Sequence, residues 1–273
     1  MHPFLQQVTP DQIVDFHAHI YPEKIAQKAS QSIGDFYGLT MNNCGTVERL
    51  LSSAREGGVG RVVVQSVATT PHQVQSINNF ISEQCKLHPG ELIGLGTIHP
   101  DMEDPIAELK RFPSLGLHGV KIHPDVQRFD MDCPKMMPLY RWLQGKMPLL
   151  IHCGDYRYGY SHPARLAHIL DEFPQLVVVG AHFGDWSVWD LALEYLKDRQ
   201  CYLDTSSSFA FLGKTRSKEL IRAYGAQRIV FGVDFPMWNH KQELETLFSL
   251  GLEENEYRLI LKGNAEKILG LSL

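Results

Sequence analysis

The chain has 273 residues, of which 44% are hydrophobic and 21% are charged, and its formal net charge is -5 at pH 7. These proportions are ordinary for a globular protein, and the length allows one large α/β domain. The acidic balance disfavours nucleic acid and anionic membranes as partners, because both attract basic surfaces. No apolar run approaches the roughly 20 residues of a membrane span, and no signal-peptide pattern opens the chain.

The cysteine pattern bears on the cellular compartment. Five cysteines are scattered along the chain without a CxxC pair, at Cys44, Cys85, Cys133, Cys153 and Cys201. An odd number of unpaired, scattered cysteines predicts reduced thiols and a cytoplasmic protein.

Eight apolar, β-branched runs recur along the chain, each followed by a helical pattern. Such runs are typical of parallel strands that are buried on both faces. The predicted strands cover 13–17, 61–66, 92–97, 119–123, 148–152, 176–182, 201–204 and 228–234. The predicted helices cover 47–55, 71–87, 105–112, 134–143, 162–173, 187–197, 214–224, 240–250 and 256–269.

Eight strand-then-helix units without a linker predict one α/β domain over residues 1–273, a (β/α)8 TIM barrel. A doubly wound open sheet is the alternative, although no G-x-G-x-x-G follows the first strand. Residues 21–43 are long for a connection between a strand and a helix. We therefore expect this insertion after the first strand to form a lid over the barrel mouth.

Titratable side chains stand where the predicted strands end, which is where a TIM barrel carries its active site. They are His17 and His19 at the first strand, Lys121 and His123 at the fourth, His152 at the fifth, His182 at the sixth and Asp234 at the eighth. Neutral imidazole and carboxylate together suit zinc or another divalent first-row metal.

Strand geometry gives the His-x-His spacing a reason. Residues i and i+2 of a strand point to the same side, so His17 and His19 can bind one ion. The same alternation predicts that Lys121 and His123 share a face, and that Asp15 lies on the face of His17.

Each of these residues also has an ordinary structural explanation. A single His-x-His occurs on many surfaces, and His152 or His182 alone fits a hydrogen-bonded core histidine. Asp234 lies two residues before Pro236 and could cap a turn. Their joint occurrence at the ends of separate predicted strands favours a metal site.

Six segments of the sequence together resemble the amidohydrolase superfamily, and within it the amidohydrolase 2 branch, which includes aminocarboxymuconate semialdehyde decarboxylase. The segments are Val14-Asp15-Phe16-His17-Ala18-His19, Gly119-Val120-Lys121-Ile122-His123-Pro124, Leu150-Ile151-His152-Cys153-Gly154, Ala181-His182-Phe183-Gly184, Gly232-Val233-Asp234-Phe235-Pro236 and Gly263-Asn264-Ala265. They span nearly the whole chain. The combination is specific for the fold and for metal dependence, and much less specific for the reaction.

The resemblance implies a role for each residue of the site. A divalent metal would be bound by His17, His19, His152 and Asp234. His182 would be the catalytic histidine beside the metal, or a ligand of a second ion. Zinc is the expected metal, with manganese and other first-row ions as alternatives.

Lys121 decides between one metal ion and two. In binuclear members of the superfamily, a lysine at the end of the fourth strand is carboxylated and bridges two ions. Here Lys121 could do the same, or keep its amine and pair with an acid or with substrate. The narrower branch is commonly mononuclear, so one ion is favoured over two.

The same site allows two reactions on a small molecule. Asp234 would take a proton from metal-bound water and His182 would stabilise developing charge, which gives hydrolysis of an amide, ester or lactone. The alternative is non-oxidative decarboxylation of an aromatic or unsaturated carboxylate, with Arg157 holding the carboxylate. His123 and Trp238 are further candidates for substrate binding.

Other classes of function are less well supported. A binding barrel without catalysis conflicts with the intact ligand set. A metal-dependent nuclease conflicts with the acidic chain. The sequence leaves open whether the protein forms a homodimer.

Overall fold

Eight parallel strands form a single sheet in this computed structural model, which describes residues 7–41 and 43–273. The strands are β1 (Val14–His19), β2 (Arg61–Gln65), β3 (Leu92–Thr97), β4 (Leu117–Ile122), β5 (Leu149–Ile151), β6 (Val178–Gly180), β7 (Tyr202–Asp204) and β8 (Ile229–Val230). Each strand pairs with the next one along the chain. All eight predicted strands are confirmed, although β8 is much shorter than the predicted 228–234.

The sheet closes on itself between the segment after β8 and β1. The backbone N–H of Asp234 donates to the carbonyl of His17 at 2.7 Å. Ala18 and Phe235 form a parallel bridge one step further along. These contacts confirm the predicted TIM barrel and exclude the open doubly wound sheet, which would leave both edge strands unpaired.

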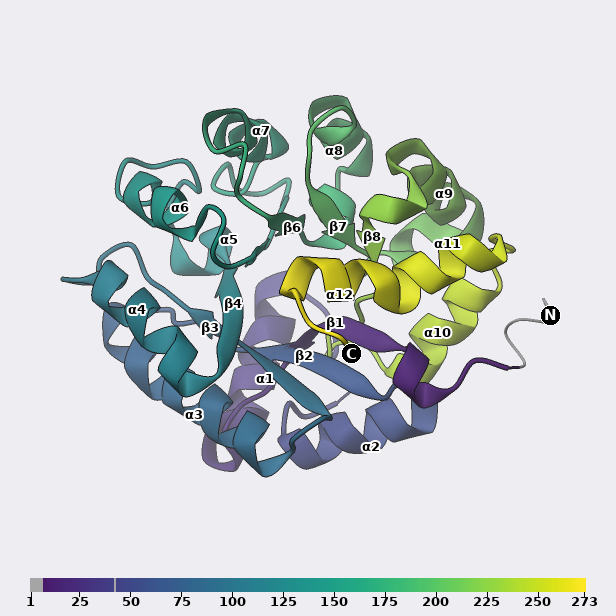
Figure 1. Ribbon diagram of the computed structural model, residues 1–273, viewed down its shortest axis with the longest axis horizontal. Coiled ribbons are helices and arrows are strands. Elements are labelled where there is room, and N and C mark those ends of the chain that lie inside the picture. The colour runs from purple at the N-terminus through teal and green to yellow at the C-terminus, as the bar shows by residue number, and fades with distance from the viewer. Residues whose placement is uncertain (1–6, 42) are drawn as a thin grey trace.

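Helices surround the barrel as an outer ring, and the last of them lies across one end of it (Figure 1). They are α1 (Glu23–Tyr37), α2 (Val47–Gly57), α3 (Val74–Leu87), α4 (Pro105–Leu115), α5 (Pro124–Gln127), α6 (Met137–Leu143), α7 (Pro163–Glu172), α8 (Trp189–Leu196), α9 (Phe209–Tyr224), α10 (His240–Phe248), α11 (Glu254–Arg258) and α12 (Asn264–Leu269). The final helix predicted over 256–269 is confirmed as an uninterrupted helical run from Glu254 to Leu269. A π-helical turn at Leu259–Gly263 separates α11 from α12.

The expected lid after the first strand contains α1, whose helical conformation was not predicted. Ala26, Ser30 and Gly34 are its buried residues and recur every four positions. Ser30 Oγ accepts a hydrogen bond of 3.0 Å from Gly45 N–H, which ties this face of α1 to the chain that follows it. No helix in the described part of the chain is long and apolar enough to cross a membrane.

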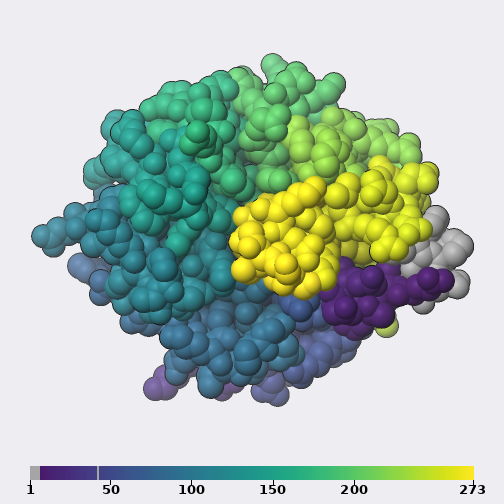
Figure 2. Space-filling view, viewed as in Figure 1, coloured from purple at the N-terminus to yellow at the C-terminus, as the bar shows by residue number. Residues whose placement is uncertain are grey.

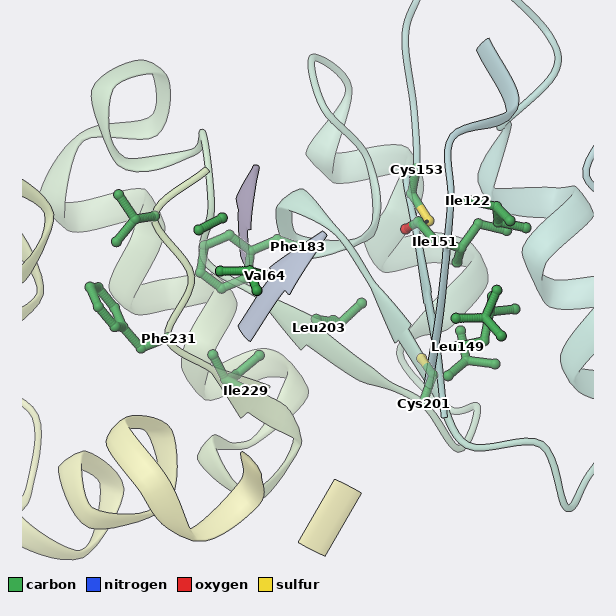
Figure 3. Close-up of a cluster of buried hydrophobic side chains, with 14 of the residues drawn as sticks. Val64, Ile122, Leu149, Ile151, Cys153, Phe183, Cys201, Leu203, Ile229 and Phe231 are labelled. Carbon is green, nitrogen blue, oxygen red and sulfur yellow. Dashed lines mark hydrogen bonds between the residues drawn. The ribbon is translucent and has the colours of Figure 1, made fainter. Parts of the chain in front are cut away.

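Alternation along the strands divides the apolar residues into two clusters. Val62 and Val64 belong to the larger one, which lies between the strands and the helices (Figure 3). Val63 belongs to the smaller one, which collects residues of six strands, as expected of a barrel interior. The two faces of a strand therefore serve two different cores.

The helix α12 closes the N-terminal end of the barrel. Ala265, Ile268 and Leu269 pack against the interior cluster, and Asn264 Nδ2 donates to the carbonyl of Ile229 at the start of β8 (2.7 Å). Figures 1 and 2 show this C-terminal segment, in yellow, lying over the near end of the barrel. The opposite end is left for the strand-end side chains.

We expect Ile268→Ala to lower the free energy of unfolding by about 2–5 kcal/mol, because it leaves a cavity beneath the barrel. Urea titration at an unchanged m-value measures this loss. Lys267→Ala, on the exposed side of the same helix, should change stability by less than about 0.5 kcal/mol. A loss below about 1 kcal/mol for Ile268→Ala would contradict the role of α12 as a packed closure.

Candidate metal centre

Two histidines of β1 and an aspartate after β8 converge at the C-terminal end of the barrel. His17 Nε2 lies 3.2 Å from His19 Nε2, and Asp234 Oδ1 lies 3.5 Å from each of them. Their potential ligand atoms are all within 4.8 Å of one another. The structure thus brings together three of the four residues predicted to bind the first metal.

An irregularity in β1 directs these histidines inward. The register between β1 and β2 shifts between Asp15 and Ala18. Asp15 Oδ2 lies 3.0 Å from His240 Nε2 on α10, outside the barrel, whereas His17 faces the cavity. The prediction that Asp15 shares the face of His17 is wrong, because a bulge breaks the alternation of side chains.

Asp204, at the end of β7, contacts the ring nitrogen of His17 that faces away from His19. Its Oδ2 lies 2.8 Å from His17 Nδ1, and both side chains are buried. Burial alone would raise the pKa of Asp204, but His17 and Ser206 hold that pKa well below its ordinary value. The ionised carboxylate fixes the proton of His17 on Nδ1 and leaves Nε2 free to bind a cation. This role was not predicted from the sequence, although Asp204 ends a predicted strand.

Burial keeps the other imidazoles neutral, which is the form that binds metal. It lowers the pKa of His19, His123 and His152 well below the ordinary value. It also lowers the pKa of His182 to about 4, against the opposing effect of Asp234.

The contact between His152 and His182 fits a bound cation. His152 Nε2 lies 2.8 Å from the carbonyl of Gly154, and His182 Nδ1 lies 2.9 Å from the carbonyl of Ser206. A carbonyl only accepts, so each of these nitrogens carries the ring proton. The remaining nitrogens, His152 Nδ1 and His182 Nε2, then direct two lone pairs at each other across 3.0 Å. A divalent metal ion fits such a donor set.

Lys121 lies next to the His17 cluster. Its Nζ is 3.2 Å from His17 Nε2, and the side chain is fully buried. Burial lowers the pKa of Lys121 to about 8, although Asp204 and Asp234 favour its charged form. At physiological pH an amine with this pKa is mostly charged but has an appreciable neutral fraction, so both a free amine and carboxylation stay open.

A second group of candidate ligands surrounds the tip of the lid. It consists of His123, Asp125 and His152, whose potential ligand atoms also lie within 4.8 Å. The rings of His123 and His152 stack at 3.7 Å, and the hydroxyl of Tyr37 lies 2.9 Å from His123 Nε2. His152 therefore stands between the two groups, and its predicted role as ligand of the first metal stays a prediction. Asp125 and Tyr37 were not predicted as site residues, because no sequence motif marks either of them.

Backbone strain is concentrated at the same strand ends. His182, Ser207 and Asp234 adopt φ values of 60°, 48° and 65°, in the left-handed region that is costly for these residues. Ser207 Oγ donates to Asp234 Oδ2 at 2.5 Å and accepts from Trp238 Nε1 at 2.9 Å. Trp238 was predicted to contact substrate, but it does not line the cavity. It orients Asp234 through Ser207 instead.

Arg157 also lies away from the cavity. Its Nε and Nη2 donate to Asp155 at 2.9 and 2.6 Å, and its Nη1 donates to the carbonyl of Phe36 at 2.6 Å. The guanidinium lies 4.9 Å from the ring centre of Phe36. Its donors are taken up by Asp155 and by the lid, so the predicted contact with a substrate carboxylate is not formed here.

The remaining predicted site residues line one cavity of about 570 Å³. They are His17, His19, Lys121, His123, His152, His182 and Asp234. Residues of α1, such as Ile33 and Tyr37, form part of its wall. The lid expected over the barrel mouth therefore covers the candidate metal centre.

We expect Asp204→Asn to lower metal affinity by about 10- to 100-fold while the fold is retained, since it removes the charge that orients His17. Titration calorimetry against a competing chelator measures the affinity. Asp171→Asn, in an exposed ion pair with Arg199, is the matched control. An unchanged affinity in Asp204→Asn would mean that His17 is not held as a ligand in this way.

Arg157→Ala should free the end of α1, because it removes charge-assisted hydrogen bonds. Backbone amides near Phe36 are expected to exchange about tenfold faster with deuterium. Arg141→Ala, an exposed arginine on α6, serves as control. Lost substrate affinity without faster exchange would instead support direct binding of substrate by Arg157.

Comparison with known proteins gives a match to the family model described as Amidohydrolase over residues 14–271. Among solved structures, an uncharacterised TIM-barrel protein from Bordetella bronchiseptica is 20% identical, with 94% of this chain and 98% of that chain covered and a TM-score of 0.76. The 5-carboxyvanillate decarboxylase of Sphingomonas paucimobilis is 16% identical, with 95% and 99% covered and a TM-score of 0.74.

A dihydroxybenzoic acid decarboxylase from a Polaromonas species, solved with bound manganese and the inhibitor 2-nitroresorcinol, is 17% identical. The alignment covers 95% of this chain and 97% of that chain, with a TM-score of 0.72. At these identities the structural likeness shows the fold alone. The family match over nearly the whole chain, joined to the barrel and its strand-end ligands, shows that this protein belongs to the amidohydrolase family.

Proposed function

We propose that the protein is a metal-dependent, non-oxidative decarboxylase of a small aromatic or unsaturated carboxylic acid. The observation that carries this proposal is the contrast within the cavity. Neutral imidazoles and Asp234 gather at its floor, whereas α1 and α3 contribute mainly apolar side chains to its walls. Two of the similar structures are decarboxylases of aromatic acids, which supports the same reaction class.

Apolar walls favour loss of carbon dioxide on physical grounds. A carboxylate concentrates charge on two oxygens, and that charge spreads into the unsaturated skeleton as the carbon–carbon bond breaks. Poor solvation therefore destabilises the ground state more than the transition state. The rings of Tyr37, His123 and Phe80 line the cavity and offer flat surfaces to an unsaturated substrate.

The mechanism assigns tasks to residues of this chain. His17, His19 and Asp234 would hold a divalent ion, with His152 as the fourth predicted ligand. When bound, the ion supplies positive charge that holds the substrate carboxylate and neutralises developing charge. The carbon keeps the electron pair of the broken bond and takes up one proton. His182 would take up a proton from solvent on Nε2 and pass it to that carbon, because Nδ1 already donates to the carbonyl of Ser206 and only Nε2 has a lone pair.

Hydrolysis of an amide, ester or lactone is the second candidate, and one observation favours it. Burial raises the pKa of Asp234, but His17, His182 and His19 together bring it below the ordinary value. An ionised Asp234 suits proton abstraction from water better than proton donation. The two reactions thus make opposite demands on the protonation of the site.

We expect carbon dioxide release from a panel of hydroxybenzoates and unsaturated carboxylates, and at most trace cleavage of matched esters, lactones and amides. Asp234→Asn should lower the decarboxylation rate by about 100-fold or more. Glu254→Gln, at an exposed ion pair on α11, is the control for a lost carboxylate. Cleavage of esters or lactones without carbon dioxide release would establish hydrolysis instead.

Removal of metal with a chelator should abolish activity, and added metal should restore it. Zinc suits the histidine-rich ligands, whereas the Polaromonas decarboxylase contains manganese, so both ions are tested separately. We expect one ion per chain by elemental analysis. Two ions per chain, appearing only with bicarbonate, would indicate a carboxylated Lys121. Full activity without bound metal would overturn the proposed function.

A further inference from the structure

The cavity is larger than a single-ring acid requires. Its volume is about 570 Å³, whereas an engineered cavity of about 150 Å³ is enough to bind benzene. The ligand cluster of His17, His19 and Asp234 makes up only a small part of the lining. The rest of the volume must be filled by a part of the substrate that does not react, or by water against apolar walls.

Two helices give the outer part of the cavity its apolar walls. On α1, Ile25, Ala29 and Ile33 follow one another every four residues, and on α3, Ile77 and Phe80 are three residues apart. Each set therefore belongs to one helix face. Ile25 is 51% exposed. The walls form an apolar slot that leads from the metal centre towards solvent.

The solvent end of this slot is polar. Its lining includes the exposed side chains of Lys28 and Ser32 on α1 and of Gln73 and Ser76 beside them. No ion pair within residues 7–41 and 43–273 involves Lys28. Among the described residues, Asp234 is the one acid that lines the cavity, and it belongs to the ligand cluster. Lys28 thus presents an uncompensated positive charge at the outer end, in a chain of net charge -5.

We propose that the substrate is an extended acid with an apolar body larger than one aromatic ring and a second acidic group that pairs with Lys28. The inference rests on the proposed function only in placing the reacting carboxylate at the metal end. The apolar body would lie between α1 and α3, where desolvation favours it. The distal acid would stay at the mouth, where it keeps part of its hydration and gains the charge of Lys28.

Binding to the manganese-loaded protein tests this by titration calorimetry with three kinds of probe. These are salicylate, its 4- and 5-phenyl derivatives, and the same two-ring acids with a carboxylate on the distal ring. We expect the better phenyl isomer to bind at least about tenfold more tightly than salicylate. The distal carboxylate should add about two- to fivefold at low ionic strength.

Matched variants separate the two parts of the proposal. Lys28→Gln should remove the gain from the distal carboxylate, whereas Lys24→Gln, an exposed lysine on the same helix that does not line the cavity, should keep it. Ile77→Trp should narrow the slot and lower the preference for two-ring acids over salicylate. Leu87→Trp, at an exposed position of α3, controls for a bulky substitution on that helix.

The outcomes distinguish this inference from the proposed function. Equal affinity for salicylate and the two-ring acids, or no binding of the two-ring acids, would overturn the inference, even if single-ring acids release carbon dioxide. The predicted order of affinity, with the loss in Lys28→Gln, supports it even if no probe releases carbon dioxide. Binding in this order without release of carbon dioxide would contradict the proposed decarboxylation but not the inference about the substrate.

Discussion

The backbone hydrogen bond from Asp234 to the carbonyl of His17 joins the two ends of the sheet, and the site depends on it. The two residues lie far apart in the sequence, and both are predicted to bind the same metal. Closure brings their side chains to one point, where Asp234 Oδ1 faces both histidines of β1. Without closure, no pair of neighbouring strands could supply this set of ligands.

This arrangement costs free energy because it buries titratable side chains. Imidazoles, a lysine and carboxylates are removed from water at the barrel mouth, which disfavours their charged forms. Neighbouring polar side chains stabilise the buried ligands. The carboxylate of Asp204 contacts His17, and the hydroxyl of Ser207 donates to Asp234. The left-handed φ values of His182, Ser207 and Asp234 belong to the same compromise. The backbone adopts strained conformations at the positions where side chains must point at the metal centre.

The sequence was most informative where a pattern repeats. Eight apolar runs predicted eight strands, and the strand ends predicted most of the residues that line the cavity. Prediction failed where one residue departs from the repeat or where a partner comes from a distant loop. Alternation misplaced Asp15 because β1 contains a bulge. Arg157 and Trp238 were predicted to bind substrate, because the sequence does not show that the carbonyl of Phe36 and the hydroxyl of Ser207 bind them instead.

The closure of the barrel also has a consequence for synthesis. Asp15 accepts a hydrogen bond from the backbone of Val233, 218 residues further along the chain. On the ribosome, β1 therefore emerges long before its second neighbour exists, and the barrel interior stays uncovered until α12 has been made. Such long-range pairing slows folding and exposes an unpaired strand edge to other chains. The same hydrogen bonds that assemble the site therefore also set how long apolar surface stays exposed during synthesis.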